Sequence, residues 1–201
     1  MVDERAQLHT LEGVTASIIV LSVLIFAVQA TSITPLTSST ANLHVERQLQ
    51  VYAQDLMTVL DYRGSSNTSS MLKSIITTWD GDTYVWNGSA YVSINYENRT
   101  LSNYLTKCLE NVMVGSGIAH NVEVLYIQNL TTGSLWKREC SPGGAGGIIC
   151  SGTPSRNAIT AARKLVLHDE DVSSDFCNNT RICDISEGSL YNIVEIQITM
   201  W

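Results

Sequence analysis

The five cysteines are the residues of this sequence whose type and spacing most directly predict covalent chemistry. Cys140 and Cys150 flank a glycine-rich loop, and Cys177 and Cys183 flank a shorter polar loop. This spacing favours the local disulfides Cys140–Cys150 and Cys177–Cys183, although sequence alone leaves the connectivity open. Cys108 is left over, either as a buried free thiol or as an intermolecular bridge. Because no Cys-x-x-Cys or Cys-x-x-His spacing occurs, we expect no metal site.

Other residue types that carry out catalysis are present, but they form no catalytic motif. His168 precedes the acidic run 169–171, which we interpret as a solvated loop rather than as a metal or general-base site. Ser141 and Ser151 lie near glycines but outside any Gly-x-Ser-x-Gly elbow. The glycine run 143–147 lacks the Lys-Ser/Thr ending of a phosphate-binding loop. We therefore expect that the protein is not an enzyme and binds no cofactor.

Five Asn-x-Ser/Thr triplets provide acceptor sites for N-glycosylation. Their asparagines are Asn67, Asn87, Asn98, Asn129 and Asn178. All five lie in the same part of the chain as the cysteines, and both features are typical of a domain outside the cytoplasm. We expect at least one of these asparagines to be glycosylated, with chance occurrence in a Ser/Thr/Asn-rich segment as the alternative.

Length and charge narrow the function classes further. With 201 residues, the chain is long enough for one ordinary domain and an extension. Its 19 Asp and Glu against 12 Lys and Arg give a net charge of -7. A nucleic-acid partner is not expected, because neutralising phosphates requires a basic face.

The apolar run from Val14 to Ile33 contains no charged residue. About 20 helical residues span roughly 30 Å, which is the thickness of a bilayer core. Three interpretations compete: a cleaved secretory signal ending at Ala30, an N-terminal anchor, and a pilin-type helix that leaves the membrane to pack into a filament. The acidic leader argues against the first, because secretory leaders are normally basic.

Three features favour the pilin-type interpretation of this run. Glu12 lies at its edge, where a carboxylate needs a partner. Small residues that permit close packing of helices occur along it, namely Ala16, Ser17, Ser22, Ala27 and Ala30. The helical periodicity also continues beyond the run, as an amphipathic stripe between Leu43 and Leu60.

The leader and several later segments also resemble a known group of proteins. Arg5-Ala6-Gln7 is similar to an archaeal class III signal site, and the segments RAQLHTLEG, TPLTSST, PSRNAITAARKLVLHDED and LYNIVEIQ resemble an uncharacterised family of archaeal membrane-anchored, pilin-like proteins. The resemblance to archaeal type IV pilins implies cleavage between Ala6 and Gln7. Glu12 would then be the sixth mature residue, whereas pilins usually place this glutamate fifth. Because a carboxylate in an apolar bundle needs a partner, we expect Glu12 to take part in assembly, paired with Arg5, His9 or the amino terminus of a neighbouring subunit.

The remaining sequence predicts a domain of strands and short helices. Helical spacing covers residues 69–79 and 101–114, Asn87-Gly88 indicates a hairpin, and strands are predicted at 122–128, 158–167 and 190–201. The last strand is the clearest, since Val194, Ile196, Ile198 and Met200 alternate with polar residues. The predicted fold class is α+β: a long N-terminal hydrophobic helix in residues 1–60, and an antiparallel β-sheet head in residues 61–201 packed on the amphipathic half of that helix.

The function expected from these features is that of a structural subunit. The resemblance implies an archaeal type IV pilus-like surface filament, polymerising through the hydrophobic N-terminal helix. Its expected partners are copies of itself, the membrane before assembly and the pilus assembly machinery, and its expected location is the cell surface. The alternative is a non-polymerising, membrane-anchored surface or secretion-system component. A secreted hydrolase or binding module is the third class.

Overall fold

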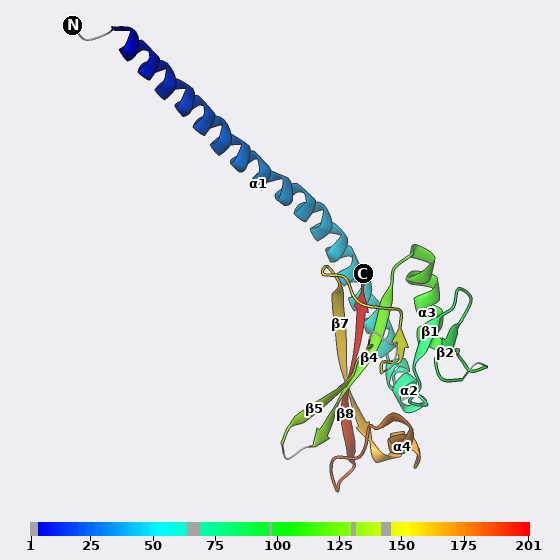
Figure 1. Ribbon diagram of the computed structural model, residues 1–201. Helices are drawn as coiled ribbons and strands as arrows, with labels where there is room; N and C mark the ends of the chain where they lie inside the picture. The colour runs from blue at the N-terminus through cyan, green and yellow to red at the C-terminus, as the bar shows by residue number, and fades with distance from the viewer. Residues whose placement is uncertain (1–3, 64–68, 97, 130–131, 142–145) are drawn as a thin grey trace. The chain divides into compact units, whose positions relative to one another are not determined.

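The computed structural model describes residues 4–63, 69–96, 98–129, 132–141 and 146–201, and within the first helix it describes the side chains of residues 12–26 and 43–61. The chain forms two compact units, Met1–Val45 and Glu46–Trp201. Helix α1 (Glu4–Asp61) supplies most of the first unit and the opening turns of the second (Figure 1). The units thus divide at Val45, whereas the sequence places its boundary after Leu60.

The first unit corrects one prediction from the sequence. Within the part of the chain that the structure describes, no helix is both long and apolar enough to cross a membrane. The described apolar stretch of α1 covers residues 12–26, which rise about 22 Å at 1.5 Å per residue, less than the roughly 30 Å of a bilayer core. The membrane-spanning helix predicted for Val14–Ile33 is therefore not found among these residues.

The last turns of α1 form part of the core of the second unit. Ala53, Leu56, Met57 and Leu60 are buried among the side chains of the sheet and the short helices. Their spacing of three and four residues places them on one face of the helix, as an amphipathic segment requires. This burial explains why the second unit begins at Glu46.

The second unit contains one eight-stranded sheet in the described residues. Its strands are β1 (Tyr84–Trp86), β2 (Tyr91–Ser93), β3 (Thr100–Leu101), β4 (His120–Asn129), β5 (Ser134–Arg138), β6 (Ile149–Cys150), β7 (Ile159–His168) and β8 (Leu190–Met200). Neighbouring strands follow the order β3-β2-β1-β6-β4-β8-β7, and β5 also pairs with β4. The long strands β4, β8 and β7 lie side by side in Figure 1.

The sheet is mixed, which corrects the predicted fold class. β1 and β6 pair in parallel, with Tyr84 opposite Ile149, and the Tyr84 amide donates to the Ile148 carbonyl at 2.9 Å. The other paired strands are antiparallel. β6 follows the glycine-rich segment, and it joins the sheet between β1 and β4 rather than through a hairpin. The fold is therefore mixed α/β, not α+β with a wholly antiparallel sheet.

Individual elements agree better with the sequence. Helices α2 (Met71–Thr77) and α3 (Tyr104–Val112), the β1–β2 hairpin and the three long strands β4, β7 and β8 were all predicted and are confirmed. Ser70 caps α2, while Asn103 and Thr106 form a capping box at the start of α3. The sequence missed β3, β5, β6 and the short elements η1 (Val114–Ser116), η2 (Asp169–Asp171) and α4 (Phe176–Thr180).

Arg138 joins three separate segments at the end of β5. Its Nε donates to the Gly146 carbonyl at 2.9 Å, and its two Nη atoms donate to the carbonyls of Thr180 and Gly81 at 3.0 Å each. The guanidinium also lies 4.7 Å from the ring centre of Trp79. One side chain thus satisfies three carbonyls, and an Arg is suited to this because its planar fork carries five N–H groups.

Gly81 is the position in this network that tolerates a side chain least. Its φ of 78° is left-handed, and a Cβ there would overlap the carbonyl oxygen of Asn179. We predict that Gly81→Ala lowers the free energy of unfolding by about 3 kcal/mol or more. The alanine would be strained at this φ, and the backbone of Asn179 would also have to move to make room for the Cβ. Gly117→Ala is the matched control: φ is 70° but no atom lies within 4 Å of the new Cβ, so about 1 kcal/mol is expected. Equal losses in urea denaturation would contradict this account.

A second prediction concerns the ion pair between Lys73 of α2 and Asp171 of η2, whose side chains are only 12% and 13% exposed. Burial acts to raise the pKa of Asp171, but hydrogen bonds from Lys73 and from the His168 backbone outweigh it and hold this pKa below its ordinary value of 3.8. The stabilisation is therefore complete above 3.8 and is lost as pH falls through the depressed pKa.

Replacing Asp171 tests this linkage. We expect Asp171→Asn to be destabilised relative to the parent protein at neutral pH, and the difference to shrink as the pH is lowered below 3.8. Denaturant titrations at a series of pH values measure it. The exposed neighbour Asp169 provides the control, because Asp169→Asn leaves the buried pair intact. A difference that stays constant with pH would show that the carboxylate charge is not responsible.

Candidate functional site

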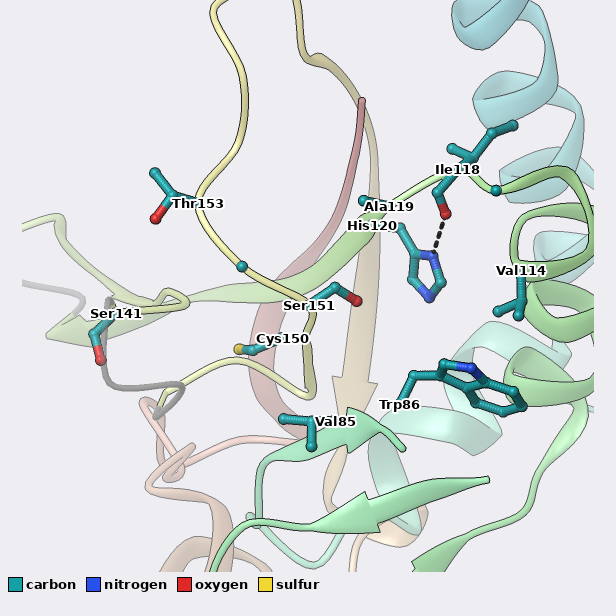
Figure 2. A pocket seen from close by; sticks show the side chains of 12 residues that line it. Val85, Trp86, Val114, Ile118, Ala119, His120, Ser141, Cys150, Ser151 and Thr153 are labelled. Atoms are coloured by element: carbon teal, nitrogen blue, oxygen red, sulfur yellow. Dashed lines mark hydrogen bonds between the residues drawn. The ribbon is translucent and has the colours of Figure 1, made fainter. Parts of the chain in front are cut away.

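The second unit contains a cavity of about 590 Å³ between β1, β6 and the start of β4 (Figure 2). Its lining combines an aromatic ring, aliphatic side chains, three hydroxyl groups and one histidine: Val85, Trp86, Val114, Gly117, Ile118, Ala119, His120, Ser141, Cys150, Ser151, Gly152 and Thr153. The volume lies within the range of small-molecule sites, which runs from about 300 to 1,000 Å³. It is therefore the candidate site of this chain.

His120 is the buried polar group at this cavity. It is 2% exposed, its Nδ1 lies 3.2 Å from the Ile118 carbonyl and its Nε2 lies 2.8 Å from the Tyr91 hydroxyl. A carbonyl only accepts, so Nδ1 carries the proton and Nε2 accepts from Tyr91. Burial lowers the pKa of His120, and burial, followed by the charge of Glu110, raises that of Tyr91. The pair is therefore neutral, with both ring nitrogens in use.

The hydroxyl-bearing side of the cavity is held by a disulfide and by an asparagine. Ser141 follows Cys140 and Ser151 follows Cys150, and these two cysteines are paired with their Cα atoms 5.5 Å apart. The buried Asn121 accepts from the Ser151 amide at 2.8 Å and donates to the Gly152 carbonyl at 2.8 Å. Because the backbone beside both serines is tied to the sheet, their positions do not depend on the loop between them.

The arrangement is better suited to binding than to catalysis. In Figure 2, Trp86, Val114 and His120 lie on one side, Ser141 and Thr153 lie on the other, and Ser151 stands between them. Among the described lining residues, His120 is the one side chain that titrates, and its Nε2 is taken up by Tyr91 rather than by a serine. A nucleophile activated by a neighbouring base, as covalent catalysis needs, is therefore not assembled by these residues.

The structure places the predicted cysteines in local pairs. Cys140 pairs with Cys150, and Cys177 pairs with Cys183 across Cα atoms 4.5 Å apart. Cys108 is a half-buried free thiol on α3, and burial raises its pKa. The first pair borders the cavity, whereas the second closes the loop that contains α4. Only the first is therefore part of the candidate site.

The other predicted site residues are not among the residues that line the cavity. Asn87, Asn98, Asn129 and Asn178 are exposed, and Asn67 lies outside the described residues. Glu12 is exposed on α1. Arg5, Ala6 and Gln7 belong to the same helix, but their side chains also lie outside the described part.

His168 lies beside the Lys73–Asp171 ion pair rather than in a metal site. Its Nδ1 is 3.5 Å from Asp171, the same carboxylate that pairs with Lys73. In the described residues, no three His, Cys, Asp or Glu side chains are grouped as metal ligands. Asp171, the last residue of η2, thus joins η2 to α2 through Lys73.

Comparison with known proteins gives one match. The profile of one protein family, described as Family of unknown function (DUF7288), matches residues 5–200. Neither curated proteins nor solved structures match the chain. The match extends over residues of both units.

The disulfides lead to a third prediction. Peptide mapping without reduction should recover the cross-links Cys140–Cys150 and Cys177–Cys183, with Cys108 alkylated after unfolding. In the chain-entropy description, loops of 10 and 6 residues contribute about 3 and 2 kcal/mol. Replacing both cysteines of a pair with serine should therefore lower the free energy of unfolding by these amounts, and the loss should be slightly larger for Cys140–Cys150 than for Cys177–Cys183. A cross-link to Cys108, or five free thiols in native protein, would contradict the assignment.

Proposed function

The chain belongs to this family of unknown function, and from its described residues we propose that it is a structural subunit of an archaeal type IV pilus-like surface filament. The subunits would polymerise through the exposed apolar segment of α1, residues 14–26. The proposed partners are further copies of the chain and the machinery that assembles them, and the proposed location is the cell surface. The family description assigns no activity, so the proposal rests on the residues themselves.

The observation that carries this proposal is the exposure of large apolar side chains in residues 14–26. Nine of them are 51% to 74% exposed: Val14, Ile18, Ile19, Val20, Leu21, Val23, Leu24, Ile25 and Phe26. Eight of them fill the runs 18–21 and 23–26, each longer than one turn, so they surround the helix rather than form one stripe. A helix that is apolar all round is stable only when it is surrounded, because contiguous exposed apolar area favours association.

The hydroxyl groups of this segment are already hydrogen-bonded within the helix. Ser17 donates to the Gly13 carbonyl at 2.7 Å, Ser22 donates to the Ile18 carbonyl at 2.8 Å and Thr15 donates to the Glu12 carbonyl at 3.0 Å. Burying a hydroxyl without a partner is unfavourable, and here that cost is avoided. The small polar residues therefore permit close approach of a neighbouring helix without leaving a polar group unsatisfied.

Glu12 gives the segment a polar boundary. It stands next to the apolar side chains, and a carboxylate that enters an apolar bundle must be paired with a cation. The cations proposed for this pairing are Arg5 or His9 of a neighbouring copy or, where the leader is cut after Ala6, the new amino terminus of that copy. A pairing between subunits would set how far one helix is shifted along the next.

The two ends of α1 differ in how far their apolar side chains are covered, and this difference supports self-association through residues 14–26. The apolar side chains near the end of α1 are already buried within that unit, including Ala53, Met57 and Leu60 at 0% exposure. The residues 14–26 have no such cover within the first unit. The same helix thus contributes to an intramolecular core and presents a surface for other molecules. Contacts that repeat head to tail without closing generate a filament.

The fourth prediction tests polymerisation with matched variants. Full-length protein transferred out of detergent should form sedimentable filaments, and Leu21→Asp should abolish them because the new charge would be buried unpaired. Leu135→Asp on β5 is the control, since Leu135 is 67% exposed and Leu21 is 62% exposed. Glu12→Gln should lower the filament yield with the second unit still folded.

Two results would contradict the proposal. Filaments from Leu21→Asp would show that residues 14–26 are not the interface. Parent protein that stays in lipid vesicles as single chains, without filaments, would instead identify the non-polymerising anchored component.

A further inference from the structure

We propose that the cavity beside Trp86 binds a neutral saccharide, with one sugar ring stacked on the indole and a hydroxyl group of the sugar bonded to Ser151. This site is separate from the assembly surface. Its residues belong to β1, β4, β6 and the loops next to them, and none belongs to α1. The proposal therefore stands whether or not the chain polymerises.

The lining has the two-sided character of a sugar ring. Trp86 and Val114 present carbon, while Ser151, whose hydroxyl points toward them in Figure 2, presents a group that both donates and accepts. A pyranose likewise has a face of C–H groups and a rim of hydroxyl groups. Aromatic rings supply large apolar contact area with defined geometry, and hydroxyl partners fix orientation. The cavity therefore matches the sugar on both sides.

Charge excludes other classes of small ligand. The described lining residues include no Lys, Arg, Asp or Glu. A phosphate or carboxylate would be desolvated without a cation, and a net charge of -7 repels it as well. A cationic ligand would lack a carboxylate here. A wholly apolar ligand would offer the Ser151 hydroxyl no partner.

The site is held in shape before a ligand arrives. Trp86 packs against Tyr91 with ring centres 5.1 Å apart, and Tyr91 is in turn bonded to His120. On the other side, the Cys140–Cys150 disulfide and Asn121 fix the backbone next to both serines. Because both walls are fixed, binding orders few side chains, which favours affinity.

The test is calorimetric titration of the full chain in a detergent without a sugar headgroup. The probes are maltose, cellobiose, lactose and chitobiose, with glucuronate, choline and indole as the charged and apolar comparators. We expect at least one disaccharide to bind and the comparators not to bind. Trp86→Leu should weaken binding roughly tenfold and Ser151→Ala about fivefold.

Trp136 provides the matched control. It is an exposed tryptophan on β5, outside the cavity, so Trp136→Leu should leave the dissociation constant unchanged. Circular dichroism checks that each variant is folded. If Trp86→Leu does not fold, Ser151→Ala still tests the proposal. Failure of all four disaccharides to bind, tighter binding of indole or choline, or equal weakening in Trp136→Leu would overturn the proposal.

The sugar has two conceivable sources, an external glycan and a glycan carried by the chain itself. Asn87 directly follows Trp86, and Ser89 completes its acceptor triplet. Protein from a host without N-glycosylation is compared with glycosylated protein. Binding of the disaccharide to both forms identifies an external glycan. The chain's own glycan is identified if the disaccharide binds the unglycosylated form, does not bind the glycosylated parent, and binds again to glycosylated Ser89→Ala protein.

Discussion

The burial of the last turns of α1 in the sheet core is the contact on which the second unit depends. Ala53, Met57 and Leu60 are fully covered there, together with Leu72 of α2 and Leu105 of α3. Without this helix the inner face of a half-covered sheet would be exposed to water. The same helix, α1, also contains the exposed apolar residues 14–26 of the first unit. One element therefore joins a stable folded unit to a surface that requires other molecules to cover it.

Within the second unit, polar contacts fix the loops that the sheet alone leaves free. Arg138 holds the carbonyls of Gly81, Gly146 and Thr180, and the Cys140–Cys150 disulfide closes the segment before β6. β6, which follows this segment, pairs in parallel with β1. The cavity lies beside the same two strands, with β1 on one side and the residues next to the disulfide on the other.

The sequence predicted the elements whose signal is local. The alternation of Val194, Ile196 and Ile198 identified β8, and Asn87-Gly88 identified the hairpin, because side-chain period and turn chemistry act over a few residues. The cysteine pairs across short loops were predictable for the same reason. The membrane-spanning helix and the wholly antiparallel sheet were wrong. The parallel pair involves a two-residue strand, which has no periodicity to detect.

The candidate site was hidden from the sequence because its parts are far apart along the chain. Tyr91 and His120 are 29 residues apart, and Trp86 meets Ser151 only through the pairing of β1 with β6. The bond between Tyr91 and His120 shows that a histidine without motif can be a buried structural partner. Ser141 and Ser151 were noted for their glycine neighbours, but their shared wall depends on the disulfide beside them.

Electron microscopy of material sheared from the surface of cells that produce this protein, with peptide identification, tests the central claim most directly. The account predicts filaments that contain this chain, with the side chains of residues 14–26 enclosed in the filament core and the second unit outside. Recovery of the chain only as dispersed molecules, or filaments whose core is formed by other residues, would contradict it.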